Sequence, residues 1–190
     1  MAFNRSSKTL SEYLFDVKSC MSGTICAILF FDKYVNSKFC MALSKIHIKT
    51  ISAEMTHIVR HPILRPGMAV ESCILPGDEL KSTIHLGAYD QDTLLGVCTI
   101  LDNPNNGTFN EPNGQIRGMA VQSSIQNKGV GRLLVEEAEN HAKYRGFEVI
   151  WMNARKGASG FYMKMGYQIE GSEFEVPIFG PHYVMKKQLL

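Results

Sequence analysis

Two glycines stand at the start of a helix pattern in the stretch SIQNKGVGRLLVEEAENHAKYRG, residues 124–146. Gln126, Gly129 and Gly131 have the spacing Q-x-x-G-x-G, with a lysine and an arginine nearby. The first N–H groups of a helix lack intrahelical partners, and the helix dipole makes that end positive. Glycine lets the backbone approach an anion without a Cβ in the way. The stretch therefore predicts a cradle for a phosphate group.

Two other phosphate motifs do not fit this stretch. A dinucleotide fingerprint, G-x-G-x-x-G, needs a glycine three positions after Gly131, where Leu134 stands. The P-loop pattern G-x-x-x-x-G-K-[ST] is absent from the sequence. Taken alone, the pair of glycines also fits a helix start in which glycine serves turn geometry only.

The elements around the glycines alternate between strand and helix patterns, which predicts an α+β domain with mixed α/β character. Strand patterns are expected in residues 45–51, on both sides of a polar turn at 90–92 within 82–101, and in 115–121, 147–155, 167–176 and 182–189. Helix patterns are expected from residue 52 until the prolines at 62 and 66 limit the helix, from 130 to about 145, and in 159–167.

Three local signals sharpen these expectations. Ser52 stands in the N-cap position of the first helix, and Gly146 is placed to end the long one. The run FEVIWMNAR, residues 147–155, is too apolar for a half-exposed strand, so it is expected at the sheet centre.

Composition bounds the class of protein and its partners. The 190 residues are 45% hydrophobic with a formal net charge of +2, and no run of five Lys or Arg occurs. Nothing therefore predicts a nucleic-acid partner or a membrane partner. Five scattered cysteines without a C-x-x-C pair, and scattered histidines, predict reduced thiols in a cytoplasmic protein and no metal site.

Residues 1–40 differ from the remainder of the chain. Their apolar run, residues 20–31, is too short to cross a hydrocarbon core of ~30 Å as a helix rising ~1.5 Å per residue. Acidic residues precede the run and no A-x-A-like site follows it, which argues against a signal peptide. Two alternatives stay open: an extension that packs on the domain, or a stretch upstream of the true start at Met41. The domain itself is expected over 41–190.

Residues 117–171 resemble the core of the GNAT superfamily of N-acetyltransferases, and stretches on both sides of them are more loosely similar to uncharacterised bacterial members. The glycine spacing matches the acyl-CoA signature [QR]-x-x-G-x-[GA] of that family. The family's A-x-x-F-Y-x-K-x-G-[FY] helix is matched by Ala158, Phe161, Tyr162, Lys164, Gly166 and Tyr167. The resemblance implies a GNAT-like fold over 41–190, in which helices flank a central, mixed, mostly antiparallel, twisted sheet.

The resemblance also implies acetyl-CoA as cosubstrate, with no metal. It implies that strand 117–121 splays at a bulge, so that N–H groups near Met119 and Val121 bind the pantetheine arm and polarise the thioester carbonyl. Asn153 matches a position that often contacts the pantetheine amide, although it also fits an ordinary strand-end turn. The residues expected to bind the cofactor are Met119, Ala120, Val121, Gln126, Asn127, Lys128, Gly129, Val130, Gly131, Arg132, Asn153 and Phe161.

Tyr162 matches the position of the family's general acid. A phenol with a pKa of ~10 lies close to an alkyl thiol near ~8.5, so donation of a proton to the leaving thiolate is nearly balanced. The alternative is that Phe161 and Tyr162 are only core aromatics of an amphipathic helix.

The general base is not fixed by the sequence. Glu71 and His182 are favoured weakly, because each lies in an apolar stretch, where a titratable side chain is unusual and can indicate a functional role. The full set of candidates is Glu71, Asp78, Glu79, Glu173, Glu175 and His182, and a solvated surface position explains each of them as well.

These observations leave more than one function open. The first is acetyl transfer from acetyl-CoA to a primary amine of a small molecule or peptide, by direct attack in a ternary complex. The second is a catalytically silent GNAT-fold module that binds or senses acyl-CoA, and a remote third is a nucleotide-binding regulator. The family forms monomers and several kinds of dimer, so a homodimer also stays open.

Overall fold

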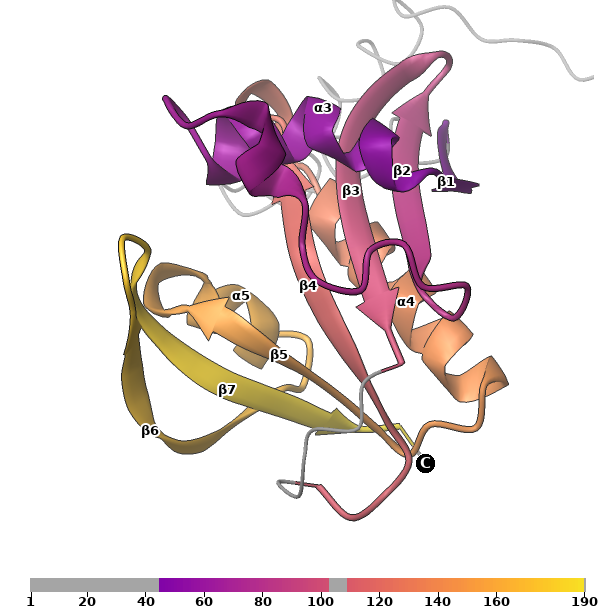
Figure 1. The fold of residues 1–190 in the computed structure, drawn as a ribbon. Helices are drawn as coiled ribbons and strands as arrows, with labels where there is room; N and C mark the ends of the chain where they lie inside the picture. Colours follow the sequence, from indigo (N-terminus) through magenta and orange to yellow (C-terminus); the bar gives the residue numbers. More distant parts are fainter. Residues whose placement is uncertain (1–44, 103–108, 190) are drawn as a thin grey trace, which may run out of the picture. The chain divides into compact units, whose positions relative to one another are not determined.

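A computed structural model describes residues 45–102 and 109–189 (Figure 1). The expectation for residues 1–40 lies outside these described residues. The strands are β1 (Ile46–Ile51), β2 (Ile84–Asp90), β3 (Thr93–Leu101), β4 (Asn113–Val121), β5 (Val149–Arg155), β6 (Gln168–Val176) and β7 (Gly180–Gln188). The helices are α3 (Ala53–Leu64), α4 (Val130–Tyr144) and α5 (Ser159–Met163), with short 3-10 turns η1 (Val70–Cys73), η2 (Ser123–Ile125) and η3 (Lys156–Ala158).

The seven strands form one sheet in the order β1-β2-β3-β4-β5-β7-β6. Every neighbouring pair is antiparallel except β4 and β5, which run parallel. The mixed, mostly antiparallel sheet expected from the sequence is therefore confirmed. No helix in the described part of the chain is long and apolar enough to span a membrane.

Helices cover both faces of the sheet, α3 on one side and α4 on the other (Figure 1). On the α3 side, Val59 packs with Leu94, Val97 and Ala120. On the α4 side the larger core gathers Leu134, Val135 and Ala138 of the helix with residues of the central strands. Burial of these apolar faces holds both helices to the sheet.

The helix ends follow the local sequence. The Ser52 side chain accepts a hydrogen bond from the Met55 N–H at 3.4 Å, so its predicted role as N-cap is confirmed. Gly146 has φ +77°, and the N–H of Phe147 reaches back to the Ala142 carbonyl. This pattern ends α4 at a left-handed glycine, as expected.

β4 and β5 separate soon after they begin. Their pairing covers only Asn113–Gln115 against Val149–Trp151, and beyond it the strands diverge (Figure 1). From Ile116 onward, no described strand pairs with the β5-facing edge of β4. A strand edge without a partner strand leaves backbone groups for other ligands.

β4 carries a bulge where the two strands diverge. In its pairing with β3, Thr99 lies opposite Arg117 and Val97 opposite Ala120, so Gly118 and Met119 together face one residue. Gly118 has φ +57°, a left-handed conformation that favours glycine. The bulge that the family resemblance implied for residues 117–121 is therefore present.

Candidate active site

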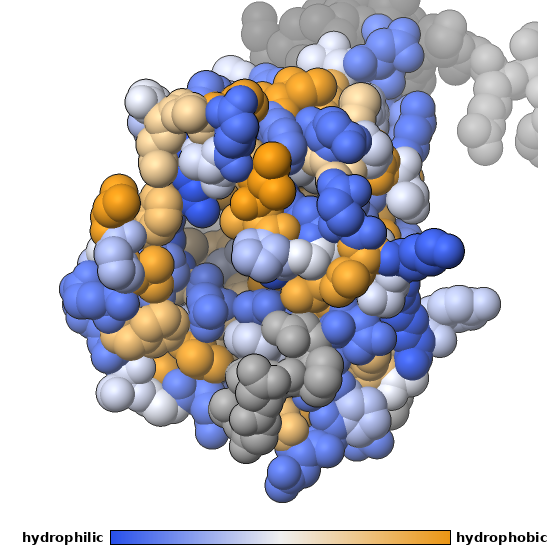
Figure 2. All heavy atoms as spheres, in the orientation of Figure 1, coloured by the Kyte–Doolittle hydropathy of each residue, from blue (hydrophilic) through white to orange (hydrophobic). Residues whose placement is uncertain are grey.

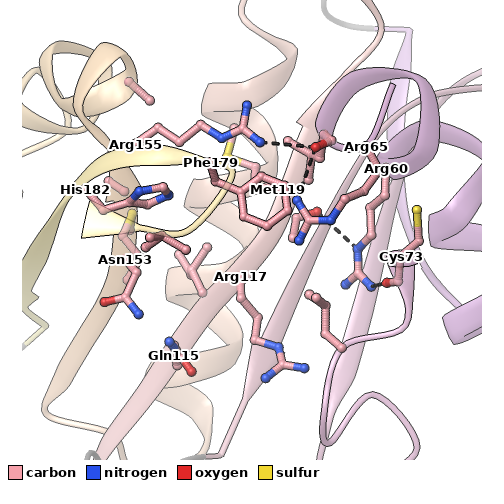
Figure 3. Close-up of a pocket in the computed structure, with 18 of the residues that line it drawn as sticks. Arg60, Arg65, Cys73, Gln115, Arg117, Met119, Asn153, Arg155, Phe179 and His182 are labelled. Carbon is pink, nitrogen blue, oxygen red and sulfur yellow. Dashed lines mark hydrogen bonds between the residues drawn. The ribbon is translucent and has the colours of Figure 1, made fainter. Parts of the chain in front are cut away.

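A cavity of about 380 Å³ opens where β4 and β5 diverge. This volume lies within the range of roughly 300–1,000 Å³ typical of small-molecule sites. Figure 2 shows this side of the molecule hollowed, with hydrophilic side chains in the wall. Side chains from α3, the η1 region, β4, β5, α5 and the β6–β7 turn form the walls, among them those labelled in Figure 3.

Asn153 shows how the separation of the strands creates this space. The neighbouring residues Trp151, Met152 and Ala154 of β5 are buried, but Asn153 is exposed and lines the cavity. Asn153 lies beyond the last β5 residue that pairs with β4, which is Trp151, so its exposure coincides with the place where the two strands diverge.

The glycine stretch forms a tight turn between β4 and α4. Asn127 and Gly129 both have left-handed backbone conformations, with φ +61° and +85°. Gly129 is the N-cap of α4, and no side chain caps the first turn. The first N–H groups of a fifteen-residue helix therefore have no capping partner, which is the arrangement that suits an anion.

Gly131 lies close to side chains of β4 and α5. A Cβ at this position would lie 2.8 Å from Cε of Met119 and 3.5 Å from Cζ of Phe161. The first turn of α4 therefore lies directly against the β4 bulge and α5. The two glycines therefore have different surroundings, and their contact with a phosphate group stays a prediction.

Gln126 ties this turn to the end of β4. Its Nε2 donates to the Val121 carbonyl at 3.0 Å, and the Gln122 N–H donates to the Leu95 carbonyl of β3 at 2.9 Å. Neighbouring residues of a strand direct their backbone groups to opposite edges, so the Val121 N–H points away from β3 and toward the gap. The sequence analysis expected an N–H group near Val121 to bind the pantetheine arm, and such a contact requires this direction.

The basic residues of the turn have protein partners. Lys128 Nζ donates to the Ser124 carbonyl at 3.1 Å, and Arg132 pairs with Glu136 at 2.8 Å on the exposed face of α4. Their contacts with a phosphate stay predictions, as does a contact made by Val130, which is buried at the helix start. Ala120 is also buried, packed toward α3 rather than into the cavity.

Tyr162 is among the residues that line the cavity and is 7% exposed. Its hydroxyl donates to the Met119 sulfur at 3.1 Å, and its ring meets those of Phe161 and Tyr167 edge to face. Burial raises the pKa of Tyr162 well above that of a free phenol. The sequence argument from an unperturbed phenol therefore needs correction: the hydroxyl is a weaker acid than assumed, and it keeps its proton at neutral pH.

His182 is a buried cavity residue on β7, where it pairs with Arg155 of β5. Its Nδ1 lies 2.8 Å from the Gly180 carbonyl, which can only accept a hydrogen bond. In the neutral ring this contact places the hydrogen on Nδ1 and leaves the lone pair on Nε2. His182 can therefore accept a proton from a group in the cavity.

The other base candidates lie elsewhere. Glu71, Glu79, Glu173 and Glu175 are exposed and none of them lines the cavity. Glu173 is held by Lys156 at 2.8 Å and by the Tyr183 hydroxyl at 2.7 Å. Of the six candidates, only His182 lies in the cavity wall. A role for Glu71 stays a prediction that its position does not favour.

Asp78 is buried behind the cavity and fully engaged. It accepts from Arg60 at 2.7 Å, from Arg117 at 3.2 Å and from the Leu75 N–H at 3.0 Å. Burial acts to raise the pKa of Asp78, but the hydrogen bonds and charges of its partners outweigh it and lower that pKa. A carboxylate held ionised by two guanidinium groups is a structural partner rather than a base.

Arg60 joins this buried carboxylate to the β4 bulge. It is 1% exposed and donates to the Gly118 carbonyl, the Cys73 carbonyl and the Thr99 hydroxyl as well as to Asp78. A Cβ on Gly118 would lie 2.4 Å from Arg60 Nε, so glycine is needed there for the guanidinium to fit. The shape of the bulge therefore depends on a residue of α3.

The sequence analysis did not identify the arginines of this site. Two signals were present: Arg60 falls on the apolar face of α3, and Arg117 lies inside the apolar strand pattern of residues 115–121. A charged residue in such a position is rarely buried without a partner. Arg65, Arg155 and Phe179 gave no comparable signal, because each lies at the end of an element or in a turn.

Comparison with known proteins agrees with this architecture. The acetyltransferase (GNAT) family model matches residues 61–167. The uncharacterised N-acetyltransferase YitI of Bacillus subtilis (strain 168) is 32% identical over 144 residues, which cover 76% of this chain and 97% of that protein.

Solved structures share the fold at lower identity. An aminoglycoside 6'-N-acetyltransferase complexed with coenzyme A superposes with a TM-score of 0.61 at 17% identity, covering 76% of this chain and 97% of that chain. An acetyltransferase of the GNAT family from Streptococcus pneumoniae has a TM-score of 0.57 at 20% identity, with 76% and 99% coverage. With a matching family model, a close relative and this fold together, the chain belongs to the acetyltransferase (GNAT) family.

Proposed function

We propose that this protein transfers the acetyl group of acetyl-CoA to a primary amine of a small molecule or peptide, by direct attack in a ternary complex. The observation that carries the proposal is the gap between β4 and β5. One end of it meets the uncapped start of α4, and the same cavity holds Asn153, Tyr162 and His182. A gap of this kind lets two substrates meet from opposite faces of the sheet.

The first turn of α4 would hold the diphosphate, with the N–H groups of Val130, Gly131 and Arg132 as donors. The pantetheine arm would follow the open edge of β4, where the Val121 N–H points into the gap. The Asn153 side chain faces this path from β5. These donors are fixed by the sheet before any ligand arrives, so little reorganisation opposes binding.

In the reaction the amine nitrogen forms a bond to the thioester carbonyl carbon, and the bond from that carbon to sulfur breaks. His182 Nε2 would take the proton that the amine loses. The Tyr162 hydroxyl, which already donates to a sulfur atom in the structure, would donate to the departing sulfur. Burial raises the pKa of a thiol as well as that of a phenol. In this buried site the pKa of the departing thiol would therefore rise together with that of Tyr162, and the difference between the two pKa values stays smaller than if burial acted on the phenol alone.

The direct test is ligand binding followed by transfer. Acetyl-CoA and CoA, each at about 100 times its Kd, should raise the free energy of unfolding by about 2.7 kcal/mol, while ATP should not. For a domain of this size that is a rise in Tm of several degrees. An amine screen that detects free CoA then measures transfer. Stabilisation by acetyl-CoA with no acceptor found in a broad screen would favour the silent acyl-CoA-binding module, and stabilisation by ATP alone would favour the nucleotide-binding regulator.

A further inference from the structure

The walls of the cavity carry positive charge and no carboxylate. The titratable side chains among the residues that line it are Arg60, Arg65, Cys73, Arg117, Arg155, Tyr162 and His182. In the described part of the chain, no Asp or Glu side chain belongs to this lining. The residues of this wall include four arginines.

Two of the four arginines are already committed to a carboxylate. Arg60 and Arg117 share Asp78, which lies behind the wall with its side chain 1% exposed. Arg60 also donates to two backbone carbonyls and a hydroxyl, so its guanidinium is occupied. These two residues support the wall.

Arg65 and Arg155 have no such partner. No carboxylate of the described residues lies within 4.0 Å of either guanidinium group. Both are partly exposed in the cavity wall, Arg65 at the end of α3 and Arg155 at the end of β5. They are the positive charges available to a ligand.

The fold holds these two like charges close together. Both guanidinium groups donate to the Leu64 carbonyl at the end of α3, Arg65 at 3.1 Å and Arg155 at 3.2 Å (Figure 3). Phe179, from the β6–β7 turn, lies beside both, with its ring centre 3.9 Å from Arg65 Cζ and 5.8 Å from Arg155 Cζ. A carbonyl and the face of an aromatic ring both attract a cation, so the pair is positioned before a ligand binds.

The unused donors suit an oxyanion. Arg65 donates from Nε to the Ser72 carbonyl and from Nη1 to the Leu64 carbonyl. Arg155 donates one Nη2 hydrogen to the same Leu64 carbonyl. The remaining N–H groups of two guanidinium planes match the oxygens of a carboxylate or phosphonate. Burial and the nearby charge of Arg155 both lower the pKa of Arg65, the sign expected of a cation without an anionic partner.

We infer that the acceptor is an amine that also carries an anionic group, with an amino acid as the simplest example. Arg65 and Arg155 bind that group and leave the amine toward Asn153 and His182. The inference rests on the proposed function and narrows its substrate class. Polyamines and aminoglycosides, which are cationic throughout, fit this wall poorly.

The test compares matched amines on the full chain. Each pair differs only in the anionic group: L-leucine with L-leucinamide, L-phenylalanine with its amide, and 2-aminoethylphosphonate with ethanolamine, with spermidine as a cationic reference. We expect kcat/KM at least tenfold higher for the anionic member of one pair, with an advantage that shrinks as salt screens the charges. The carboxylate and phosphonate pairs separate the two sources of the anion.

The variants Arg65→Gln and Arg155→Gln assign the effect to these residues. Each should raise KM at least tenfold for the anionic amine and less than threefold for its neutral partner, with a smaller change in kcat. Arg65→Lys keeps the charge but loses the planar guanidinium group. Its KM for the anionic amine should lie between the values of the unsubstituted protein and of Arg65→Gln. Lys143→Gln, which removes an exposed charge near the end of α4, is the control for net charge and should leave both constants unchanged.

A preference for neutral or cationic amines would overturn the inference, as would arginine variants that affect both members of a pair equally. Calorimetric titration of the anionic amine into the protein without acetyl-CoA separates this failure from failure of the proposed function. If no amine is acetylated, but the anionic amine still binds and Arg155→Gln weakens it tenfold, the anion site stands and the transfer reaction falls. If acetyl transfer proceeds and no anionic amine binds, the proposed function stands and the inference of an anion site is wrong.

Discussion

The two sides of the β4–β5 gap are both positive, but they are built in different ways. On the α4 side, one continuous stretch from Val121 to Arg132 supplies backbone N–H groups and glycines. On the α3 side, four arginines come from α3, β4 and β5, and Phe179 joins them from the β6–β7 turn. Partial charges of a backbone suit a cosubstrate common to a whole family. Full charges on separate elements suit one acceptor.

The difference extends to what each side needs for stability. The glycine turn is held by local bonds, such as that from Gln126 to Val121. The α3 side depends on the buried Arg60–Asp78 pair, which ties the helix and the η1 region to the β4 bulge. Substitutions in the buried pair on the α3 side should therefore lower the stability of the whole domain. Substitutions in the glycine turn on the α4 side should affect ligand binding alone.

The largest effect is expected from Arg60→Met. It leaves the buried Asp78 with Arg117, at 3.2 Å, as its charged partner and with the Leu75 N–H as a neutral donor. Removing one partner of a buried pair costs about 3–5 kcal/mol. For a domain of this size, Tm should fall by about 6–20 °C. Thermal unfolding of the variant and of the unsubstituted protein measures the difference.

The matched control is the double variant Arg60→Met with Asp78→Leu, which should regain much of the lost Tm because it removes both charges of the buried pair. Arg117 loses Asp78 in this variant, but its side chain is 16% exposed and keeps the Pro76 carbonyl as a partner. The pH dependence gives a second check. The pKa of Asp78 is lowered in the folded state, so its contribution to stability is present above pH ~4 and is lost as pH falls below that. A Tm change of less than 2 °C in Arg60→Met would mean that the pair does not hold the two elements together.

The next effect is expected from His182→Gln. Loss of a positioned general base typically costs a factor of about 10² or more, so kcat should fall about a hundredfold while the Kd for acetyl-CoA stays unchanged. His141→Gln, on the outer part of α4, is the control and should behave like the unsubstituted protein. A variant with normal turnover would remove His182 from the role.

Gly129→Val should separate the cosubstrate side from the acceptor side. A β-branched residue at φ +85° is strained by about 1–3 kcal/mol, and relief of the strain would move the first turn of α4. We expect at least a tenfold weaker Kd for acetyl-CoA. Gly146→Val places the same strain at the opposite end of the helix, at φ +77°, and should leave that Kd unchanged. Equal effects from both variants would point to general destabilisation instead.

Tyr162→Phe should lower turnover at least tenfold without weakening acetyl-CoA binding. The ring packing is retained, and only the hydroxyl that faces the Met119 sulfur is lost. Tyr167→Phe, a substitution in the neighbouring buried ring, is the control and should keep normal turnover. Unchanged turnover in Tyr162→Phe would leave this residue as a core aromatic.

The smallest effect is expected from Glu71→Gln. Glu71 is exposed on η1 and does not line the cavity, so kcat should change less than twofold. A tenfold fall, measured under the same conditions as His182→Gln, would instead support Glu71 as the base and would move the chemistry toward the η1 region.

Much of the fold was predictable from local pattern. The Ser52 cap, the left-handed Gly146 and the central place of the strand predicted in residues 147–155 each follow from neighbouring residues and were confirmed. The exact face that α4 buries depends on its neighbours in the fold. Val135 and Ala142 take core positions, while Leu133 and His141 lie half-buried at the margin of the core.

The same distinction between local sequence and tertiary contacts applies to the candidate active site. The sequence by itself predicted the glycine turn from residue spacing, and through its resemblance to a known family it indicated the family and the candidate acid Tyr162. This was possible because those residues lie in one continuous stretch, where local spacing carries the signal. Only the tertiary structure decided which base candidate lines the cavity, how far burial raises the pKa of Tyr162, and which arginines gather at Phe179. These depend on segments far apart in the chain meeting across a sheet, and on the burial that the meeting creates, neither of which local spacing encodes.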